Sequence, residues 1–128
     1  MAIIQMLVKA QERSNLMETY YDPADLKKFS GDGIGAYATE AWDNFMNYYG
    51  PLYNDGALTA REKHLIALGV AAALQCPYCI EAHGAACMEA GCDGDQIMEV
   101  FQTAASLRAG ATLAHATQVL HVIEDNEL

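Results

Sequence analysis

Basic residues are scarce in this chain. Only seven of its 128 residues are Lys or Arg, against 17 Asp or Glu, and the formal net charge is −10. Nucleic acids and anionic membrane surfaces both bind clustered Lys and Arg, so the composition argues against either as a partner. The same charge disfavours a strongly anionic substrate. We therefore expect no nucleic-acid partner and no membrane partner.

The sequence also predicts no membrane-spanning segment and no secretory signal. The opening apolar stretch AIIQMLVKA is too short to cross a bilayer, lacks a basic start and is followed by the charged QER. We expect a cytoplasmic protein. In a reducing compartment, four cysteines are more typical of catalytic, metal-binding or core positions than of structural disulfides.

Strand-like alternation is absent, and β-branched residues are sparse. Apolar residues make up 52% of the chain, so a core can form without disulfides or metal. The sequence predicts an all-α fold, a single-domain helical bundle of about six helices over residues 1–128, with a helical N-terminal extension (1–56) and a core (57–123). The expected helices cover DLKKF after Asp22-Pro23, then 36–49, 60–74, 77–90, QIMEVFQTAASLRAG after Asp93 or Asp95, and ATLAHATQVLHVIE.

Two stretches between these helices bear on function. The glycine run SGDGIG follows a helix and not a strand, so we interpret it as a connector and not as a phosphate-binding loop. Gly50-Pro51 should end the second helix, whose aromatic stripe is typical of a core or a subunit contact.

Thr59 and Glu62 form a capping-box pattern. The helix that they start is apolar on every side from Leu65 to Leu74, which predicts burial all round or a subunit contact.

The stretch LQCPYCIEAHG contains the residues best suited to catalysis, two cysteines and a histidine. Pro77 breaks the preceding helix and suits the first turn of the next, which places Cys76 at an N-cap. Cys76, Cys79 and His83 then lie on one helix face, at offsets of three and four residues. The helix N-terminus favours a thiolate at Cys76, whereas His83 can take the proton of Cys79. The residues alone leave both cysteines as candidates for the attacking thiol.

Two other interpretations compete for the same residues. Zinc would need a third or fourth ligand, and Cys87 lies about 16 Å from Cys76 along the helix, too far to join it. We therefore expect no metal and no cofactor. The cysteines and His83 could also be plain core residues.

Cys87 and Cys92 lack a proton carrier in register and are expected to be spectators, with Cys92 exposed beside Gly91. Surface or structural roles are expected for His115, His121, Arg61 and Arg108.

The residues GALTAREKHLIALGVAAALQCPYCIEAHG and AGCDGDQIMEVFQTAASLRAGATLAHATQVL resemble the carboxymuconolactone decarboxylase superfamily, in particular its alkyl hydroperoxidase D-like branch. DLKKF, YYGPLYNDGALTAREK and ALQCPYCIEAH also resemble small peroxidase-like proteins associated with arsenosugar biosynthesis. The resemblance implies an all-helical domain, assembly into homo-oligomers, and thiol peroxidase chemistry with a small-molecule peroxide and an external dithiol reductant.

The resemblance also implies roles for individual residues. Cys79 would attack the peroxide, Cys76 would resolve it as a disulfide, and His83 would relay protons together with a carboxylate twelve residues before Cys76. His64 stands at that position in place of the acid. An imidazole can also shuttle a proton, so His64 is a candidate for the relay, or it marks a member with weakened peroxidase activity.

Two functions compete with the peroxidase. A lactone decarboxylase, the activity that names the superfamily, would not need the CxxC pair. A non-catalytic dithiol protein could use the same pair to hold a soft ion such as trivalent arsenic. The leading hypothesis is an antioxidant enzyme that reduces hydrogen peroxide or organic hydroperoxides through Cys76 and Cys79.

Overall fold

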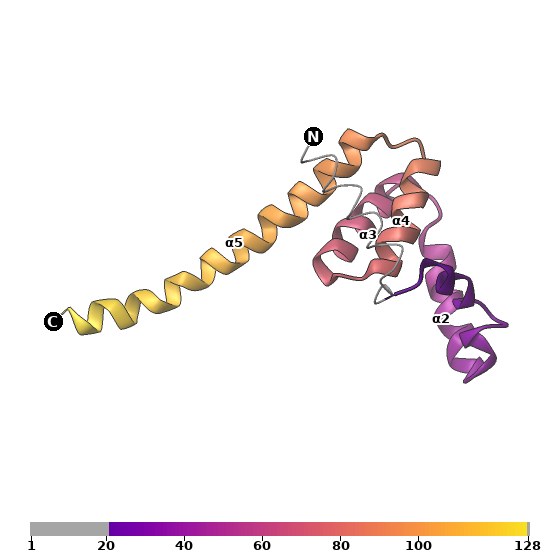
Figure 1. The fold of residues 1–128 in the computed structure, drawn as a ribbon, viewed down its shortest axis with the longest axis horizontal. Helices are drawn as coiled ribbons and strands as arrows, with labels where there is room; N and C mark the ends of the chain where they lie inside the picture. Colours follow the sequence, from indigo (N-terminus) through magenta and orange to yellow (C-terminus); the bar gives the residue numbers. More distant parts are fainter. Residues whose placement is uncertain (1–20, 128) are drawn as a thin grey trace, which may run out of the picture. The chain divides into compact units, whose positions relative to one another are not determined.

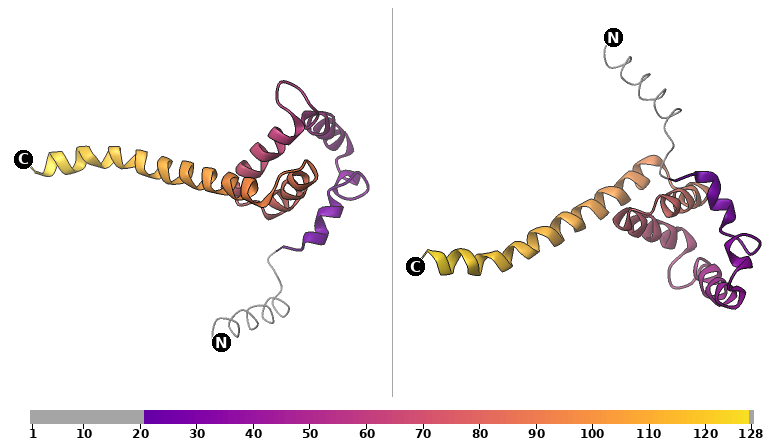
Figure 2. Two further views of the ribbon diagram at one scale, coloured as in Figure 1. Left: turned by 90° about the horizontal axis from the view of Figure 1, so that it is seen from above. Right: turned by 60° about the horizontal axis from the view of Figure 1, so that its bottom comes forward.

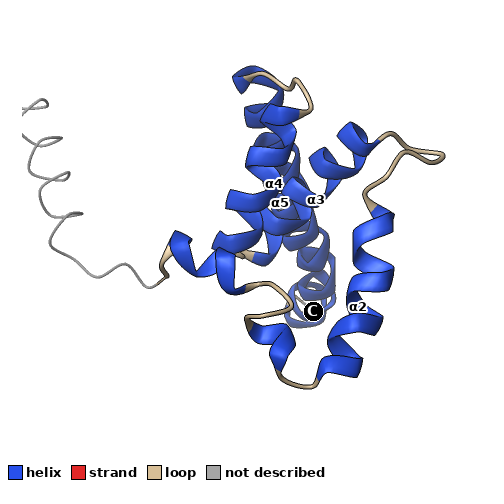
Figure 3. Ribbon diagram, turned by 90° about the vertical axis from the view of Figure 1, so that its right-hand side faces the viewer, coloured by secondary structure: helices blue, strands red, loops and turns tan. Residues whose placement is uncertain are grey.

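The fold is all-α, as predicted. The computed structural model describes residues 21–127, and every regular element within that range is helical (Figures 1 and 3). The elements are the 3-10 helices η1 (Pro23–Lys28) and η2 (Ile34–Ala36), then α2 (Thr39–Leu52), α3 (Ala60–Leu74), α4 (Pro77–Glu89) and α5 (Gly94–Asn126). The chain divides into two compact units between Asp43 and Asn44. No helix of the described residues is long and apolar enough to cross a membrane.

In the first unit, the short helix predicted for DLKKF is the 3-10 helix η1. The Asp22 carboxylate accepts a hydrogen bond from the backbone N–H of Ala24 at 2.9 Å, and Pro23 occupies the first turn, as expected. At six residues, the segment is longer than most 3-10 helices. The glycine run leads into η2 with no strand before it, which agrees with a connector.

Trp42 organises the rest of the first unit. Its indole lies edge-on to the Phe29 ring, with ring centroids 5.0 Å apart. It also lies against the backbone of Gly35, where a Cβ atom would overlap the indole ring. This close approach of the Trp42 indole requires glycine at position 35.

The predicted end of α2 at Gly50-Pro51 is wrong. The helix continues to Leu52 with Pro51 inside its last turn. Gly50 does not have positive φ, so it continues the helix and does not terminate it. Pro51 lacks an N–H and costs one helical hydrogen bond, a loss that the final turn tolerates better than the interior does.

The α3–α4 pair is built as its caps predicted. The Thr59 hydroxyl accepts from the Glu62 N–H, and the Glu62 carboxylate accepts from the Thr59 N–H. Gln75 ends α3 in the left-handed conformation, with φ of 57°. This reversal brings α4 back against α3. The core of the second unit forms between α3, α4 and the start of α5, from the buried Leu68, Cys87 and Cys92 with Leu65, Ile80, Ile97, Val100 and Phe101 around them.

The burial predicted for α3 is wrong within this chain. Only Leu68 and Ala71 of this helix are buried, whereas Ile66, Val70 and Leu74 are exposed by 54%, 51% and 71%. α4 and α5 are the helices that pack most extensively on α3. The apolar surface of α3 is larger than the area that its two neighbouring helices can cover.

Cys92 is buried and not exposed as predicted. Gly91, at φ of 82°, ends α4, and the backbone N–H of Cys92 donates to the Cys87 carbonyl at 2.9 Å. This hydrogen-bond pattern brings the residues at its two ends into apolar contact, here Cys87 and Cys92. Burial and the contact with Cys92 raise the pKa of the Cys87 thiol, which keeps it protonated and unreactive.

The two last predicted helices are one. α5 runs unbroken from Gly94 to Asn126 (Figure 2). An Asp93–Gln96 capping box begins it. The prediction treated Gly110 as a break, but Gly110 does not have positive φ. Its neighbours are alanines, which have high helix propensity and carry the helix through the glycine.

Candidate redox site

The two cysteines of the CPYC stretch form a disulfide in this structure. Cys76 and Cys79 are joined, with their Cα atoms 5.3 Å apart. Cys76 is the N-cap of α4, as predicted, and its sulfur accepts from the backbone N–H of Cys79 at 3.2 Å. A backbone N–H of the first helical turn thus points toward the Cys76 sulfur. This arrangement stabilises a thiolate when the disulfide is reduced.

His83 lies one helical turn beyond Cys79 and is the one buried polar side chain among the described residues, with 8% of its surface exposed. Burial, and after it the nearby charge of His64, lowers the pKa of His83 below the usual 6.5. The imidazole is therefore neutral near pH 7. A neutral imidazole can accept a proton from a thiol.

The structure places His64 directly against His83. His64 projects from α3, and its Nδ1 atom lies 3.2 Å from the Nδ1 atom of His83, within hydrogen-bond distance. Glu62, the nearest acid in the sequence, is committed elsewhere. Its carboxylate accepts from the backbone and the hydroxyl of Thr59, which lowers the pKa of the acid. The position of the expected carboxylate is thus filled by an imidazole.

Two tyrosines that the sequence did not single out complete the cluster. The Tyr49 hydroxyl lies 3.4 Å from Nε2 of His83. The Tyr53 ring stacks on His64, with centroids 4.8 Å apart and planes inclined by 11°, and lies 5.0 Å from the His83 ring. Burial, the neighbouring Tyr49 and a hydrogen bond to Tyr49 raise the pKa of Tyr53, so its phenol stays protonated.

These contacts fit one direction of hydrogen bonding. The Tyr49 hydroxyl can donate to Nε2 of His83 in the tautomer that carries its hydrogen on Nδ1. In that tautomer, Nδ1 of His83 donates to Nδ1 of His64. His64 holds its remaining hydrogen on Nε2. Both nitrogens of His83 are engaged in the disulfide form.

Cys79 and His83 line the same cavity, which has a volume of about 480 Å³. Its wall comes from the end of α2, the following loop, α3 and α4. Apart from Tyr49, Tyr53, Lys63, Cys79 and His83, the lining is aliphatic: Leu52, Leu58, Ile66, Ala67, Val70, Ala71 and Leu74. Cys79 and His83 thus share a mostly aliphatic cavity.

Other residues named from the sequence lie elsewhere. His115 and His121 are exposed on α5, away from the cluster. Arg108 donates to the backbone carbonyl of Ala73 at 2.8 Å and so caps the last turn of α3, a structural role. Within residues 21–127, no group of three or more His, Cys, Asp or Glu side chains is placed to hold a metal ion.

Comparisons with known proteins agree with this architecture. The sequence profile of the carboxymuconolactone decarboxylase family matches residues 39–121. The uncharacterized protein 4 in the cox locus of Paracoccus denitrificans is 43% identical over 83 residues, which cover 65% of this chain and 75% of that protein. A crystal structure of a Methanobacterium thermoautotrophicum protein aligns with a TM-score of 0.63 and 29% identity, over 66% of this chain and 98% of the other. The resemblance seen in the sequence is thereby confirmed, and the chain belongs to the carboxymuconolactone decarboxylase family.

Proposed function

We propose that the protein is a thiol peroxidase of the alkyl hydroperoxidase D-like branch, which reduces hydrogen peroxide or organic hydroperoxides. The observation that carries the proposal is the Cys76–Cys79 disulfide at an apolar cavity that Cys79 shares with a buried, neutral histidine. A lactone decarboxylase needs no such pair. The disulfide is the oxidised state that the proposed cycle passes through.

The cycle begins with the reduced pair. The Cys79 thiolate attacks one oxygen of the peroxide, the O–O bond breaks, and the products are a sulfenic acid on Cys79 and a hydroxide or alkoxide that takes up a proton. The Cys76 thiolate then attacks the sulfenic sulfur, forms the disulfide and releases hydroxide, which is protonated to water. An external dithiol reduces the disulfide by exchange and is itself oxidised.

His83 is the proposed proton carrier for Cys79. A helical side chain leans toward the N-terminal turn, so the imidazole can reach the Cys79 sulfur from one turn away. Nε2 of His83 accepts from Tyr49 in the disulfide form, and the thiol of Cys79 would compete for this nitrogen after reduction. The proton that His83 takes from the thiol returns to the departing oxygen of the peroxide.

His64 is the proposed outer member of the relay. A proton that reaches Nδ1 of His64 from His83 can leave from Nε2, so the imidazole passes it on without holding a net charge. A carboxylate would do the same work and would also stabilise a protonated His83. The stacked Tyr53 ring holds the His64 imidazole in the plane that this transfer requires.

The His64 relay predicts an ordered series of variants. His64→Ala should slow peroxide turnover by about 10-fold to 100-fold, less than the roughly 10²-fold to 10⁴-fold expected for a group that acts on the substrate directly, because His64 acts through His83. His64→Glu should retain or exceed the wild-type rate, because it supplies a carboxylate next to His83. Steady-state peroxide consumption at a saturating dithiol concentration measures all three. Equal rates would show that position 64 has no part in catalysis.

The function itself is tested on the wild-type protein. Reduced protein is mixed with hydrogen peroxide or with cumene hydroperoxide in the presence of dithiothreitol, and the loss of peroxide is followed. We expect catalytic consumption of at least one of the two, above the rate of dithiothreitol alone. The aliphatic cavity favours the organic peroxide. If both peroxides were consumed no faster than by dithiothreitol alone, the result would contradict the proposed peroxidase function.

A further inference from the structure

The cavity that Cys79 and His83 share, which we call the redox cavity, has one cation in its wall among the described residues, Lys63. This side chain is half-buried near the start of α3. Its ammonium donates to the backbone carbonyl of Asn54 at 2.6 Å, and a Cβ atom at Gly56 would lie 3.3 Å from its nitrogen. The loop residues next to this contact line the cavity as well. The ammonium is therefore held at the side of the cavity where the loop after α2 passes.

No carboxylate within residues 21–127 forms an ion pair with this ammonium. The two acids nearest to it in the sequence cap the start of α3. The Asp55 carboxylate accepts from the backbone N–H of Ala60 at 2.7 Å, and the Glu62 carboxylate accepts from that of Thr59 at 2.7 Å. An ammonium has three N–H donors, and one of them is used by the loop carbonyl. The others can bind an anionic group of a ligand through charge-assisted hydrogen bonds.

The position of this cation relative to the thiol sets the length of such a ligand. His83 meets His64, the residue after Lys63, and Cys79 lies four residues before His83 on α4. The sulfur and the ammonium are thus about 6 Å apart along the helix direction, at 1.5 Å per residue, and they come from two packed helices whose axes commonly lie about 8–10 Å apart. Their separation is on the order of 10 Å. Most of the remaining cavity lining is aliphatic.

We infer that the redox cavity takes hydroperoxides of aliphatic carboxylic acids, with the carboxylate on Lys63, the chain along the aliphatic wall and the peroxide group at Cys79. This inference rests on the proposed peroxidase function and names its substrate class. The net charge of −10 disfavours a strongly anionic substrate, but such an acid carries a single charge, and the cavity has a cation to meet it.

Reduction leaves the acid group of the substrate unchanged. The Cys79 thiolate takes the outer oxygen of the hydroperoxide, the O–O bond breaks, and the chain keeps the inner oxygen as an alcohol after it gains a proton. The oxygen on Cys79 leaves as water when Cys76 closes the disulfide, and the external dithiol supplies the two electrons. Lys63 binds the far end of the molecule and neither peroxide oxygen. Its contribution is the same before and during the reaction, so it should act on KM and not on kcat.

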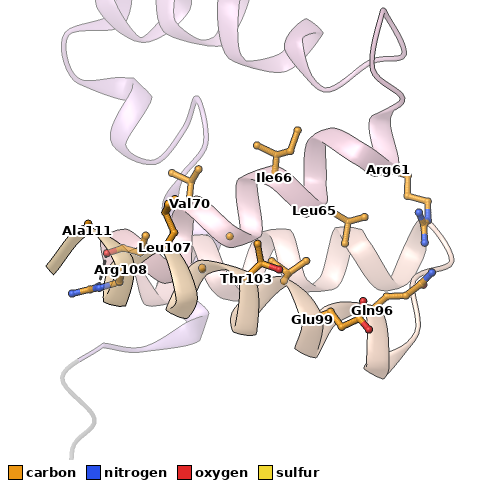
Figure 4. A pocket seen from close by; sticks show the side chains of 14 residues that line it. Arg61, Leu65, Ile66, Val70, Gln96, Glu99, Thr103, Leu107, Arg108 and Ala111 are labelled. Atoms are coloured by element: carbon orange, nitrogen blue, oxygen red, sulfur yellow. Dashed lines mark hydrogen bonds between the residues drawn. The ribbon is translucent and has the colours of Figure 1, made fainter. Parts of the chain in front are cut away.

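A second apolar hollow is the competing location for an aliphatic acid. It lies between α3 and α5, has a volume of about 690 Å³ and has Arg61 and Arg108 toward its two ends (Figure 4). None of the described residues that line it is Cys or His, so a peroxide bound there would meet no thiol. Arg61 stands two residues before Lys63, about 200° around the helix. It is therefore a matched control, a cation of the same helix that lies outside the redox cavity.

Binding of octanoate tests the Lys63 contact without any turnover. Octanoate or octanol is titrated into the ¹⁵N-labelled disulfide form, and amide chemical shifts are followed by NMR. We expect shifts among residues 49–83 that line the redox cavity, and tighter binding of the acid than of the alcohol. Lys63→Met should raise the octanoate dissociation constant at least about 10-fold, the usual effect of losing a hydrogen bond to a charged group. Arg61→Met should change it less than about 2-fold. Shifts centred on residues 96–111, no octanoate binding, or equal affinity in Lys63→Met would overturn the inference.

Turnover separates this inference from the peroxidase function itself. Linoleic acid hydroperoxide, its methyl ester and cumene hydroperoxide are supplied with dithiothreitol. Lys63→Met should raise the KM for the acid about 10-fold more than the KM for the ester, and Arg61→Met should leave the ratio of the two unchanged. A wild type that reduces cumene hydroperoxide but does not prefer the acid to the ester would overturn the substrate class and leave the peroxidase in place. Octanoate binding that depends on Lys63, with no peroxide consumed, would keep the acid site and overturn the peroxidase.

Discussion

Replacement of Cys79 by Ser is expected to lower peroxide consumption by at least about 10³-fold, as is usual when an attacking nucleophile is removed. A serine hydroxyl is not ionised near pH 7 and is a far weaker nucleophile toward peroxide oxygen than a thiolate. The substitution is nearly isosteric, so the fold should persist. Peroxide loss with dithiothreitol is the measurement, and retained helical circular dichroism shows that the protein is folded.

The matched control for Cys79→Ser is Cys92→Ala. Cys92 is buried against Cys87 and lies outside the redox cavity, so its loss should leave the rate within about 2-fold of wild type while lowering stability modestly. Activity retained in Cys79→Ser would exclude this residue as the nucleophile. An equal loss in Cys92→Ala would show that the effect reflects general damage to the core.

His83→Gln is expected to reduce the rate by about 10²-fold to 10⁴-fold, the usual contribution of a positioned acid–base group. Glutamine can still hydrogen-bond Tyr49 but cannot carry the thiol proton. His115→Gln, on the exposed part of α5, is the matched control and should have wild-type activity. A wild-type rate in the His83→Gln protein would show that His83 does not transfer the thiol proton.

The pH dependence of the wild-type rate gives a second measure of the same residue. The folded-state pKa of His83 lies below 6.5, because burial and His64 disfavour the protonated ring. The neutral ring is the base, so the rate should hold at pH 6.5 and fall only as the pH drops through this lowered pKa. His64→Ala removes one cause of the lowering and should move the acid limb toward higher pH. A wild-type acid limb above pH 6.5 would contradict the assignment.

Local signals in the sequence predicted much of the arrangement around the cysteines. Pro77 and the i, i+3, i+7 spacing sufficed to place Cys76 at the N-cap of α4, with Cys79 and His83 in register. These features depend on residues within two helical turns, where backbone geometry determines what can meet. The Thr59–Glu62 capping box was predictable for the same reason.

Features that depend on distant residues were missed. Tyr49 and Tyr53 approach His83 and His64 only because the loop after α2 returns the chain to α3 and α4, and no spacing in the sequence encodes that return. A signal was nevertheless available, since two tyrosines four residues apart, Tyr49 in α2 and Tyr53 in the turn after it, precede the CxxC stretch.

Glycine was the least reliable marker of helix ends. Gly91 has positive φ and ends α4, whereas Gly50 and Gly110 have negative φ and lie within helices. The residue type permits both outcomes, and neighbouring residues decide between them. Gly91 is followed by a cysteine that can bury itself against Cys87, which favours the turn. Gly110 is flanked by alanines, which favour continuation.

The assignment of roles within the cysteine pair can be decided on Cys76→Ser protein treated with one equivalent of peroxide. Without the resolving thiol, the first oxidised species should persist, and a dimedone-type reagent should label Cys79 as a trapped sulfenic acid in tryptic mass spectra. Wild type under the same conditions should form the Cys76–Cys79 disulfide and leave Cys87 reduced. If instead the sulfenic acid formed on Cys76 in Cys79→Ser protein at the wild-type rate, while Cys79 in the Cys76→Ser protein stayed unlabelled, the helix N-cap and not His83 would select the attacking thiol, and the roles of the two cysteines would be reversed.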